Sequence, residues 1–239
     1  MSRLTALDSA RHAALRVNPA HGAAFGDDVR LCSLVAAEIA DAAVDVPVLL
    51  ARDGDTGEIY VAALLGFDEG ENLMLDGGRW IARHKPLSLQ HPPFYAHPTA
   101  DGADVYIDLD SPRVGVRGEP LFDADGAFSP YLEHIRSVLA ELLAGQAKTQ
   151  AFAARLLDLG LVEPLQLALP FADGERRLAG LFALRREAVA ALPDEAVVAL
   201  HRRGELELIH LMTASLRHLE ILVRLKEGRI ANETKAANG

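Results

Sequence analysis

Apolar and polar residues form two kinds of pattern along the chain, and each kind predicts a different element. Two short apolar runs separated by a glycine-containing loop lie near 46–66, and a second such pair lies near 165–184. Both arrangements are typical of β-hairpins. Residues 104–110 alternate between polar and apolar, as expected of a half-buried strand. The sequence therefore predicts an antiparallel or mixed sheet built from these two hairpins and this strand.

Apolar residues at three- and four-residue spacing predict helices near 129–159. Ser129 followed by Pro130 favours a helix start, because serine caps the first free N–H groups and proline fits the first helical position. Gly145 and Gly160 are residues of the kind that ends helices. We therefore expect two short helices, joined by a turn at Gly145 and ending at Gly160.

The last part of the chain is predicted to be helical near 187–226. Its longest helix is expected at 205–226, with an apolar stripe wider than one buried face requires. Such a helix either packs on two sides within the chain, which we favour, or also contacts a second copy in a homo-oligomer. Residues 227–239 contain few apolar side chains and predict a disordered tail. The expected organisation is a single α+β domain over 1–226.

Composition and charge limit the classes of function. The 239 residues are 50% hydrophobic, and 24 Lys and Arg against 34 Asp and Glu give a net charge of −10. Such a chain is a poor match for nucleic acid or an anionic membrane, since both require clustered basic residues. No apolar stretch approaches the roughly 20 residues that span a bilayer. The N-terminus lacks a signal-peptide pattern, and the single cysteine, Cys32, forms no disulfide framework, so a cytoplasmic protein is predicted.

Catalytic and metal-binding motifs do not occur in the sequence. Asp53 and Asp55, like Asp123 and Asp125, begin as calcium loops do, but the later ligand positions are missing, so we interpret both pairs as turns. The histidines form no His-x-x-x-His pair, and neither a Gly-x-Ser-x-Gly nucleophile elbow nor a Gly-Lys-Ser/Thr phosphate loop is present. We therefore predict no catalytic residues, no metal and no cofactor.

The most unusual segment is 66–123, which combines acidic, basic and aromatic residues. Residues 101–133 hold eight acids and two arginines, and so carry more than half of the excess negative charge. We select seven candidate binding residues: Glu71, Asn72, Arg79, Trp80, Asp108, Asp110 and Arg113. Two interpretations remain open. One is a solvated strand edge whose acids pair with Arg113 or Arg79, and the other is a polar pocket walled by Trp80, the only tryptophan.

A specific ion pair follows from the strand pattern. Asp108 and Asp110 would lie on one strand face with their carboxylates about 7 Å apart, and their repulsion requires a neighbouring cation. A Ser-Pro turn precedes Arg113 and can direct its guanidinium back over that face. We predict that Arg113 pairs with Asp108, Asp110 or Glu71. We further predict that Trp80 packs beside this pair with its indole N–H hydrogen-bonded.

Short motifs spread along the chain occur in a recognisable order. They are Phe25-Gly26, 34–38, Pro47, 63–66, Glu71-Asn72-Leu73, Gly78-Arg79-Trp80, 108–113, 118–123, 129–132, 160–165 and Asp173-Gly174. Their order and spacing, from about Leu4 to Lys226, resemble the bacterial SapC family. The resemblance assigns no catalytic residues.

The resemblance implies a connection with the bacterial envelope. The family is named for a surface layer, and its members sit beside genes for halogenase-like flavoproteins, cupin-type hydroxylases and TonB-dependent receptors. It therefore implies a non-enzymatic soluble accessory protein that binds a protein or peptide partner in envelope nutrient uptake or a surface layer. The permease label that some members carry does not fit this chain. The alternative is an enzyme or enzyme subunit that acts on a small molecule or peptide beside those hydroxylases and halogenases, with an acidic pocket around Trp80.

Overall fold

The largest sheet contains both predicted hairpins. In the computed structural model, which describes residues 3–99 and 102–237, this sheet has five strands, each antiparallel to its neighbours. In spatial order they are β12 (Val162–Phe171), β13 (Gly174–Leu184), β4 (Val48–Arg52), β5 (Ile59–Leu64) and β3 (Leu31–Ser33). The hairpins near 46–66 and 165–184 are therefore confirmed, and so is the α+β class.

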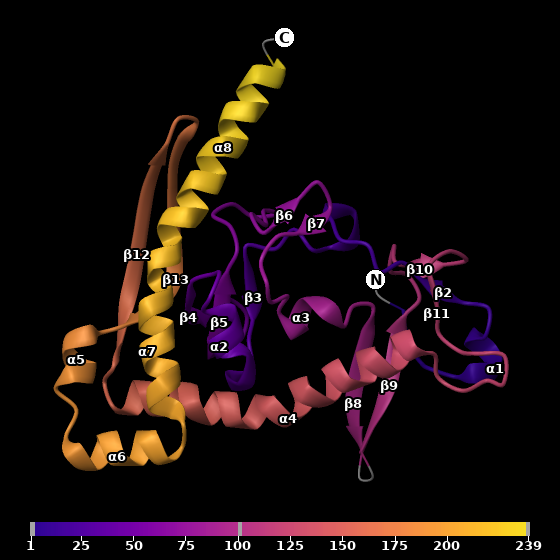
Figure 1. The fold of residues 1–239 in the computed structure, drawn as a ribbon, viewed down its shortest axis with the longest axis horizontal. Coiled ribbons are helices and arrows are strands. Elements are labelled where there is room, and N and C mark those ends of the chain that lie inside the picture. The colour runs from indigo at the N-terminus through magenta and orange to yellow at the C-terminus, as the bar shows by residue number, and fades with distance from the viewer. Residues whose placement is uncertain (1–2, 100–101, 238–239) are drawn as a thin grey trace.

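The strand expected near 104–110 lies in a second sheet. It is β9 (Gly102–Asp108), which pairs with β8 (Phe94–Thr99) on one side and with β1 (Leu4–Ala6) on the other. The expectation that it joins the two hairpins in one sheet is wrong, because β8 directly precedes it and pairs with it locally. Figure 1 shows β8 and β9 well separated from β12 and β13.

Smaller elements connect the two sheets. The short strands are β2 (Arg16–Val17) with β10 (Val114–Gly115) and β11 (Glu119–Pro120), and β6 (Leu75–Asp76) with β7 (Arg79–Trp80). The short helices are α1 (Ser9–His12), α2 (Ile39–Ala42) and α3 (Leu87–Gln90), and 3₁₀ turns lie at Ala23–Phe25, Ala36–Glu38 and Leu216–His218. The aspartate loops form turns as predicted, since Asp53 and Asp123 accept hydrogen bonds from backbone N–H groups that follow them.

A single helix, α4 (Pro130–Asp158), replaces the two short helices expected near 129–159. Its start is as predicted, because the Ser129 hydroxyl accepts a hydrogen bond from the Leu132 N–H at 3.2 Å. Gly145 does not end the helix, so this expectation is wrong. A Cβ atom at position 145 would lie 2.7 Å from the Cβ atom of Val35. Glycine at this position therefore lets the helix approach Val35 more closely than any other residue would.

The helix α4 joins two hydrophobic clusters. The larger cluster surrounds β4 and β5 and includes Phe152 and Leu156 from the second half of α4. The smaller cluster includes Phe94 and Ile107 from β8 and β9, and the first half of α4 adds three residues to it. These are Leu132, Ile135 and Leu139. Figure 1 shows α4 running from the β8–β9 hairpin toward the start of β12.

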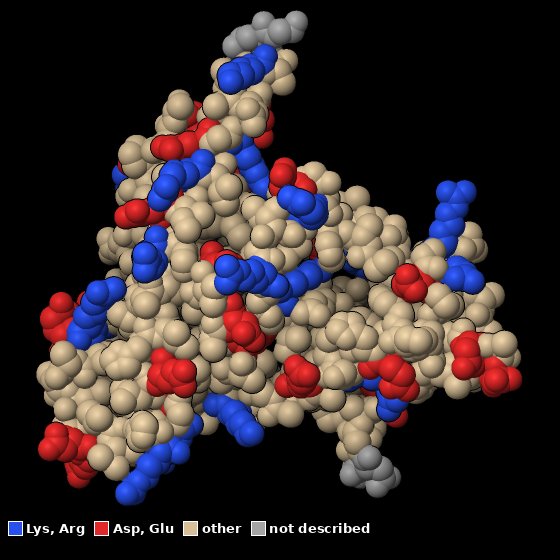
Figure 2. All heavy atoms as spheres, viewed as in Figure 1, with Lys and Arg blue, Asp and Glu red and all other residues tan. Residues whose placement is uncertain are grey.

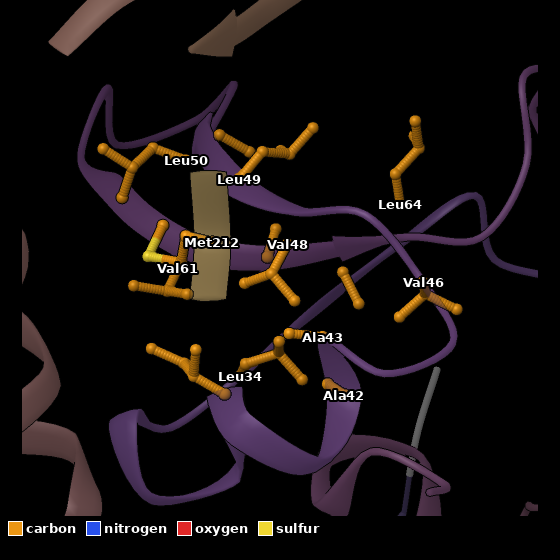
Figure 3. Packing of buried hydrophobic residues seen from close by; sticks show 14 of the residues in the cluster. Leu34, Ala42, Ala43, Val46, Val48, Leu49, Leu50, Val61, Leu64 and Met212 are labelled. Atoms are coloured by element: carbon orange, nitrogen blue, oxygen red, sulfur yellow. The ribbon is translucent and has the colours of Figure 1, made fainter. Parts of the chain in front are cut away.

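The larger cluster is built from segments far apart in the sequence. Figure 3 shows Leu34, Val48 and Val61 together with Met212, which comes from a C-terminal helix. All four are buried. The main sheet is therefore covered partly by the chain that precedes β4 and partly by the last quarter of the molecule.

The C-terminal region contains four helices among the residues that the structure describes. They are α5 (Arg186–Ala190), α6 (Asp194–Arg202), α7 (Glu205–Ser215) and α8 (Leu219–Ala237). The single helix expected over 205–226 is divided by the 3₁₀ turn at Leu216–His218. The Ser215 hydroxyl binds the backbone of Val48, and leucines on both α7 and α8 pack against the larger cluster. This apolar face therefore packs at least partly against the larger cluster of the same chain, and the homo-oligomer contact stays a prediction.

The structure differs from the disordered tail expected over 227–239, because α8 continues to Ala237. Ile230 on this extension is buried. Arg229 donates hydrogen bonds to the backbone carbonyls of Asn72, at 2.8 Å, and Leu75. These contacts fix the start of the extension to the body of the protein. Beyond them α8 projects from the molecule (Figure 1).

Among residues 3–99 and 102–237, no helix is both long and apolar enough to cross a bilayer. Acidic and basic side chains are interspersed over the face shown in Figure 2. On this face, the excess negative charge is therefore distributed rather than gathered into one acidic region.

The contact at Gly145 predicts an unusual response to alanine. Alanine is normally better than glycine inside a helix by roughly 1 kcal/mol, but at this position its methyl group would overlap Val35. We expect Gly145→Ala to lower the free energy of unfolding by about 1–3 kcal/mol, measured by chemical denaturation.

The matched control is Gly228→Ala in α8, where an added Cβ meets nothing within 4 Å. This variant should be neutral or stabilised by up to about 1 kcal/mol. Equal effects of the two substitutions would contradict the role given to Gly145.

Candidate functional site

The seven candidate binding residues have different partners and do not form one pocket. Asp108 is the last residue of β9, and the exposed Asp110 lies just beyond it. The backbone N–H of Arg3 donates to the Asp108 carboxylate at 2.9 Å, and the Arg3 side chain lies 3.3 Å from that of Asp110. The cation that relieves their repulsion is therefore Arg3, and neither Arg113 nor Arg79 supplies it. This part of the segment is the end of a central strand rather than a strand edge, because β9 has β1 on one side and β8 on the other.

Arg113 is buried and pairs with Asp27, so the predicted pairing with Asp108, Asp110 or Glu71 is wrong. Its Nη2 donates to both carboxylate oxygens of Asp27, at 2.9 and 2.8 Å, and each side chain is only 4% exposed. Its Nη1 donates to the backbone carbonyl of Ala20 at 2.6 Å. The aromatic ring under the guanidinium is that of Phe25, 5.0 Å away, rather than that of Trp80.

Asn72 belongs to the same buried region. Its Nδ2 donates to the backbone carbonyl of Asp27 at 2.7 Å, and its Oδ1 accepts from the Met74 N–H at 2.9 Å. Asn72 and Arg113 therefore both hold Asp27, one through the main chain and one through the carboxylate. The two candidates act together on a residue that the sequence analysis did not select.

Glu71 lies in a different ion-pair network. The ammonium group of Lys226 on α8 donates to Glu71 at 2.7 Å and to Asp68 at 2.6 Å, and Arg176 on β13 also binds Asp68. Partial burial lowers the pKa of Lys226, but its hydrogen bonds with the two carboxylates outweigh this and raise it overall. The network joins α8 to the loop after β5 and to the main sheet.

Trp80 and Arg79 lie on the short strand β7. The indole N–H of Trp80 donates to the backbone carbonyl of His84 at 3.0 Å, so the predicted hydrogen bond is confirmed. The ring packs against the larger hydrophobic cluster, whereas Arg79 is exposed. The structure thus does not gather Glu71, Arg79 and the two aspartates around Trp80.

A groove of about 590 Å³ lies between the second half of α4 and the main sheet. Its walls are the first half of β5, the β4–β5 turn, the segment after β3, and residues 142–153 of α4. We call it the β5 groove. No sequence motif marks this groove, because several distant segments form it and its lining contains no catalytic signature.

One wall of the β5 groove is an open strand edge. The strand β3 pairs only with residues 62–64 of β5, so Ile59 and Tyr60 have a partner strand on the β4 side alone. The Val61 carbonyl accepts a hydrogen bond from the Leu34 N–H on the β3 side. Because backbone groups of alternate residues point to the same side of a strand, the N–H and C=O of Ile59 are directed toward the open edge.

The side chains of the β5 groove combine apolar and polar surface. Leu142 and Leu143 of α4 provide apolar area, and Asp53 and Glu58 place two acids at the end formed by the β4–β5 turn. Hydrogen bonds from the backbone N–H and the hydroxyl of Thr56 lower the pKa of Asp53, so it is ionised at neutral pH. The groove can therefore offer backbone hydrogen bonds, apolar contact and negative charge to a bound segment.

Comparison with known proteins identifies one family. The family model described as SapC matches residues 7–222, which include both hairpins, α4 and the C-terminal helices through the start of α8. Neither the curated proteins nor the solved structures include a match to this chain.

The burial of the Asp27–Arg113 pair predicts a large effect of its loss. Arg113→Ala leaves the Asp27 carboxylate buried without its main partner, so we expect the free energy of unfolding to fall by about 3 kcal/mol or more. Arg117→Ala, at an exposed position four residues on, should change it by less than about 0.5 kcal/mol. Chemical denaturation of both variants measures the difference. Small and equal losses would show that the pair does not stabilise the fold.

Proposed function

Because the chain belongs to the SapC family, we propose that it is a non-enzymatic accessory protein that binds an extended peptide segment of a partner protein in the β5 groove. The family resemblance supports a link to envelope nutrient uptake or a surface layer, and we propose the cytoplasm as the compartment in which it acts. The observation that carries the proposal is the open half of the β5 edge beside a groove of about 590 Å³.

Strand addition supplies the affinity. An extended peptide that pairs with an open strand edge gains main-chain hydrogen bonds whatever its sequence, and pockets for alternate side chains add selectivity. In the β5 groove the N–H and C=O of Ile59 are the pairing groups. Side chains of the peptide that point inward would contact Leu142 and Leu143 of α4.

The charge of the groove selects among peptides. Asp53 and Glu58 lie at the same end of the lining, and the described lining contains no lysine or arginine. Opposite charge across an interface favours correct partners and raises the association rate. The preferred segment therefore carries Lys or Arg at the end that reaches the β4–β5 turn.

The geometry supports the rival functions less well. An enzyme with an acidic pocket around Trp80 requires Glu71 and Asp108 to converge, but Glu71 binds Lys226 and Asp108 binds Arg3. A homo-oligomer through 205–226 requires a free apolar face, but the leucines of this region pack against the larger cluster of the same chain.

The test selects peptides from a random displayed library on the wild-type protein. Enriched sequences are expected to contain β-branched residues and at least one Lys or Arg. We expect Gln146→Trp, which fills the groove from α4, to weaken the binding of an enriched peptide at least about tenfold, equivalent to 1.4 kcal/mol. Fluorescence anisotropy measures the dissociation constant.

Ala144→Trp is the matched control, because residue 144 is exposed on α4 and does not line the groove. This variant should bind the peptide as the wild type does. Hydrogen exchange at the Ile59 amide should slow in the complex. Enriched peptides that bind Gln146→Trp with unchanged affinity, or a selection that enriches none, would reject the proposal.

A further inference from the structure

A second cavity, of about 400 Å³, lies beside the first half of α4 and shares no lining residue with the β5 groove. Its polar lining includes Lys85, His21 and Arg113, with Tyr131 from α4. Apolar side chains such as Leu89 and Ile135 form other parts of its wall. We call it the Lys85 cavity. Its volume lies within the range of small-molecule sites.

The charges around the Lys85 cavity are not balanced. Asp27 is bound by Arg113, and the Lys85 ammonium lies 3.9 Å from the Asp27 carboxylate, which is too long for a hydrogen bond. One carboxylate thus faces two cations, whose side chains are only 15% and 4% exposed. A buried charge without a counter-ion is costly, so this arrangement favours the entry of one negative charge.

The hydrogen-bond donors also exceed the acceptors. The Lys85 ammonium lies 3.0 Å from Nδ1 of His21. An ammonium group only donates, so Nδ1 of the neutral imidazole accepts and the ring proton lies on Nε2. Burial and the Lys85 charge lower the pKa of His21, which keeps the ring neutral at pH 7. In addition, the buried Nε of Arg113 has no hydrogen-bond partner within the described part of the chain.

We propose that the Lys85 cavity binds a small molecule with a single carboxylate, which accepts hydrogen bonds from Lys85 and His21 while its apolar part lies against Leu89 and Ile135. Lys85, Arg113 and the Asp27 carboxylate together carry one net positive charge, which the single negative charge of the ligand balances. A phosphate dianion would exceed this balance. The site is separate from the β5 groove, so it stands or fails independently of the proposed peptide binding.

The affinity should depend on pH through Lys85. Burial lowers the pKa of Lys85, the negative charge of Asp27 raises it, and the positive charge of Arg113 lowers it. The resulting pKa is about 8. His21 and, from α4, Tyr131 and His134 complete the titratable lining of the cavity. Because the lysine must be protonated to hold a carboxylate, binding should be strong at pH 7 and decline as the pH rises through about 8.

Calorimetric titration of the full chain with benzoate tests the proposal, since benzoate joins one carboxylate to an apolar ring. We expect saturable binding with a dissociation constant of about 1 mM or lower, and binding of the neutral isostere benzamide at least about tenfold weaker. Inorganic phosphate is the competing probe. Tighter binding of phosphate than of benzoate, or equal binding of benzamide, would overturn the proposal.

Two variants locate the site. Lys85→Met should weaken benzoate binding at least about tenfold, and His21→Phe, which removes the ring N–H donor, provides a second substitution should Lys85→Met fail to fold. Lys148→Met, at an exposed position on α4 outside both lining sets, should leave the affinity unchanged. The affinity of the wild type should also fall between pH 7 and pH 9. An unchanged affinity in a folded Lys85 or His21 variant would reject the assignment.

Discussion

The continuity of α4 is the constraint on which the rest of the structure depends. Its first half completes the smaller hydrophobic cluster and its second half completes the larger one. Between the halves, Gly145 allows close contact with Val35, and the Thr149 hydroxyl accepts a hydrogen bond from the Ala36 N–H at 2.7 Å. Residues of the two halves also wall the Lys85 cavity and the β5 groove. One rigid helix thus fixes both proposed sites relative to each other.

A buried carboxylate holds the segment on which α4 rests. Glu38, only 4% exposed, accepts hydrogen bonds from the N–H groups of Val35 and Leu87, each at 2.9 Å. The His84 imidazole lies 2.9 Å from the same carboxylate. These contacts connect the 3₁₀ turn at Ala36–Glu38 to the segment that carries Lys85. Hydrogen bonds to a charged group contribute more than neutral ones, which suits a junction between the two halves of the molecule.

Features set by neighbouring residues could be predicted from the sequence. The two hairpins, the Ser129 cap and the aspartate turns depend on residues within a few positions of each other, and all are present. The indole hydrogen bond of Trp80 is also local, since its acceptor is four residues away. In each of these cases the partner lies inside the window that a sequence pattern describes.

Features set by distant residues could not be predicted in this way. Arg113 binds Asp27, which is 86 residues away, although three acids closer in the sequence appeared to be suitable partners. Gly145 matches the pattern of a helix end, and only the position of Val35 shows that it serves a close approach instead. Lys85 and His21 belong to no motif, because the fold alone places them beside Arg113.

The two-cluster role of α4 also restricts how the chain can vary in length. A helix has 3.6 residues per turn, so deletion of one residue rotates everything beyond it by about 100°. A deletion between Leu139 and Phe152 would therefore turn one of these side chains out of its cluster while the other stays in place. Surface connections such as the β12–β13 turn can change length without rotating buried side chains out of a cluster. Relatives of different length should accordingly place their insertions and deletions outside 139–152.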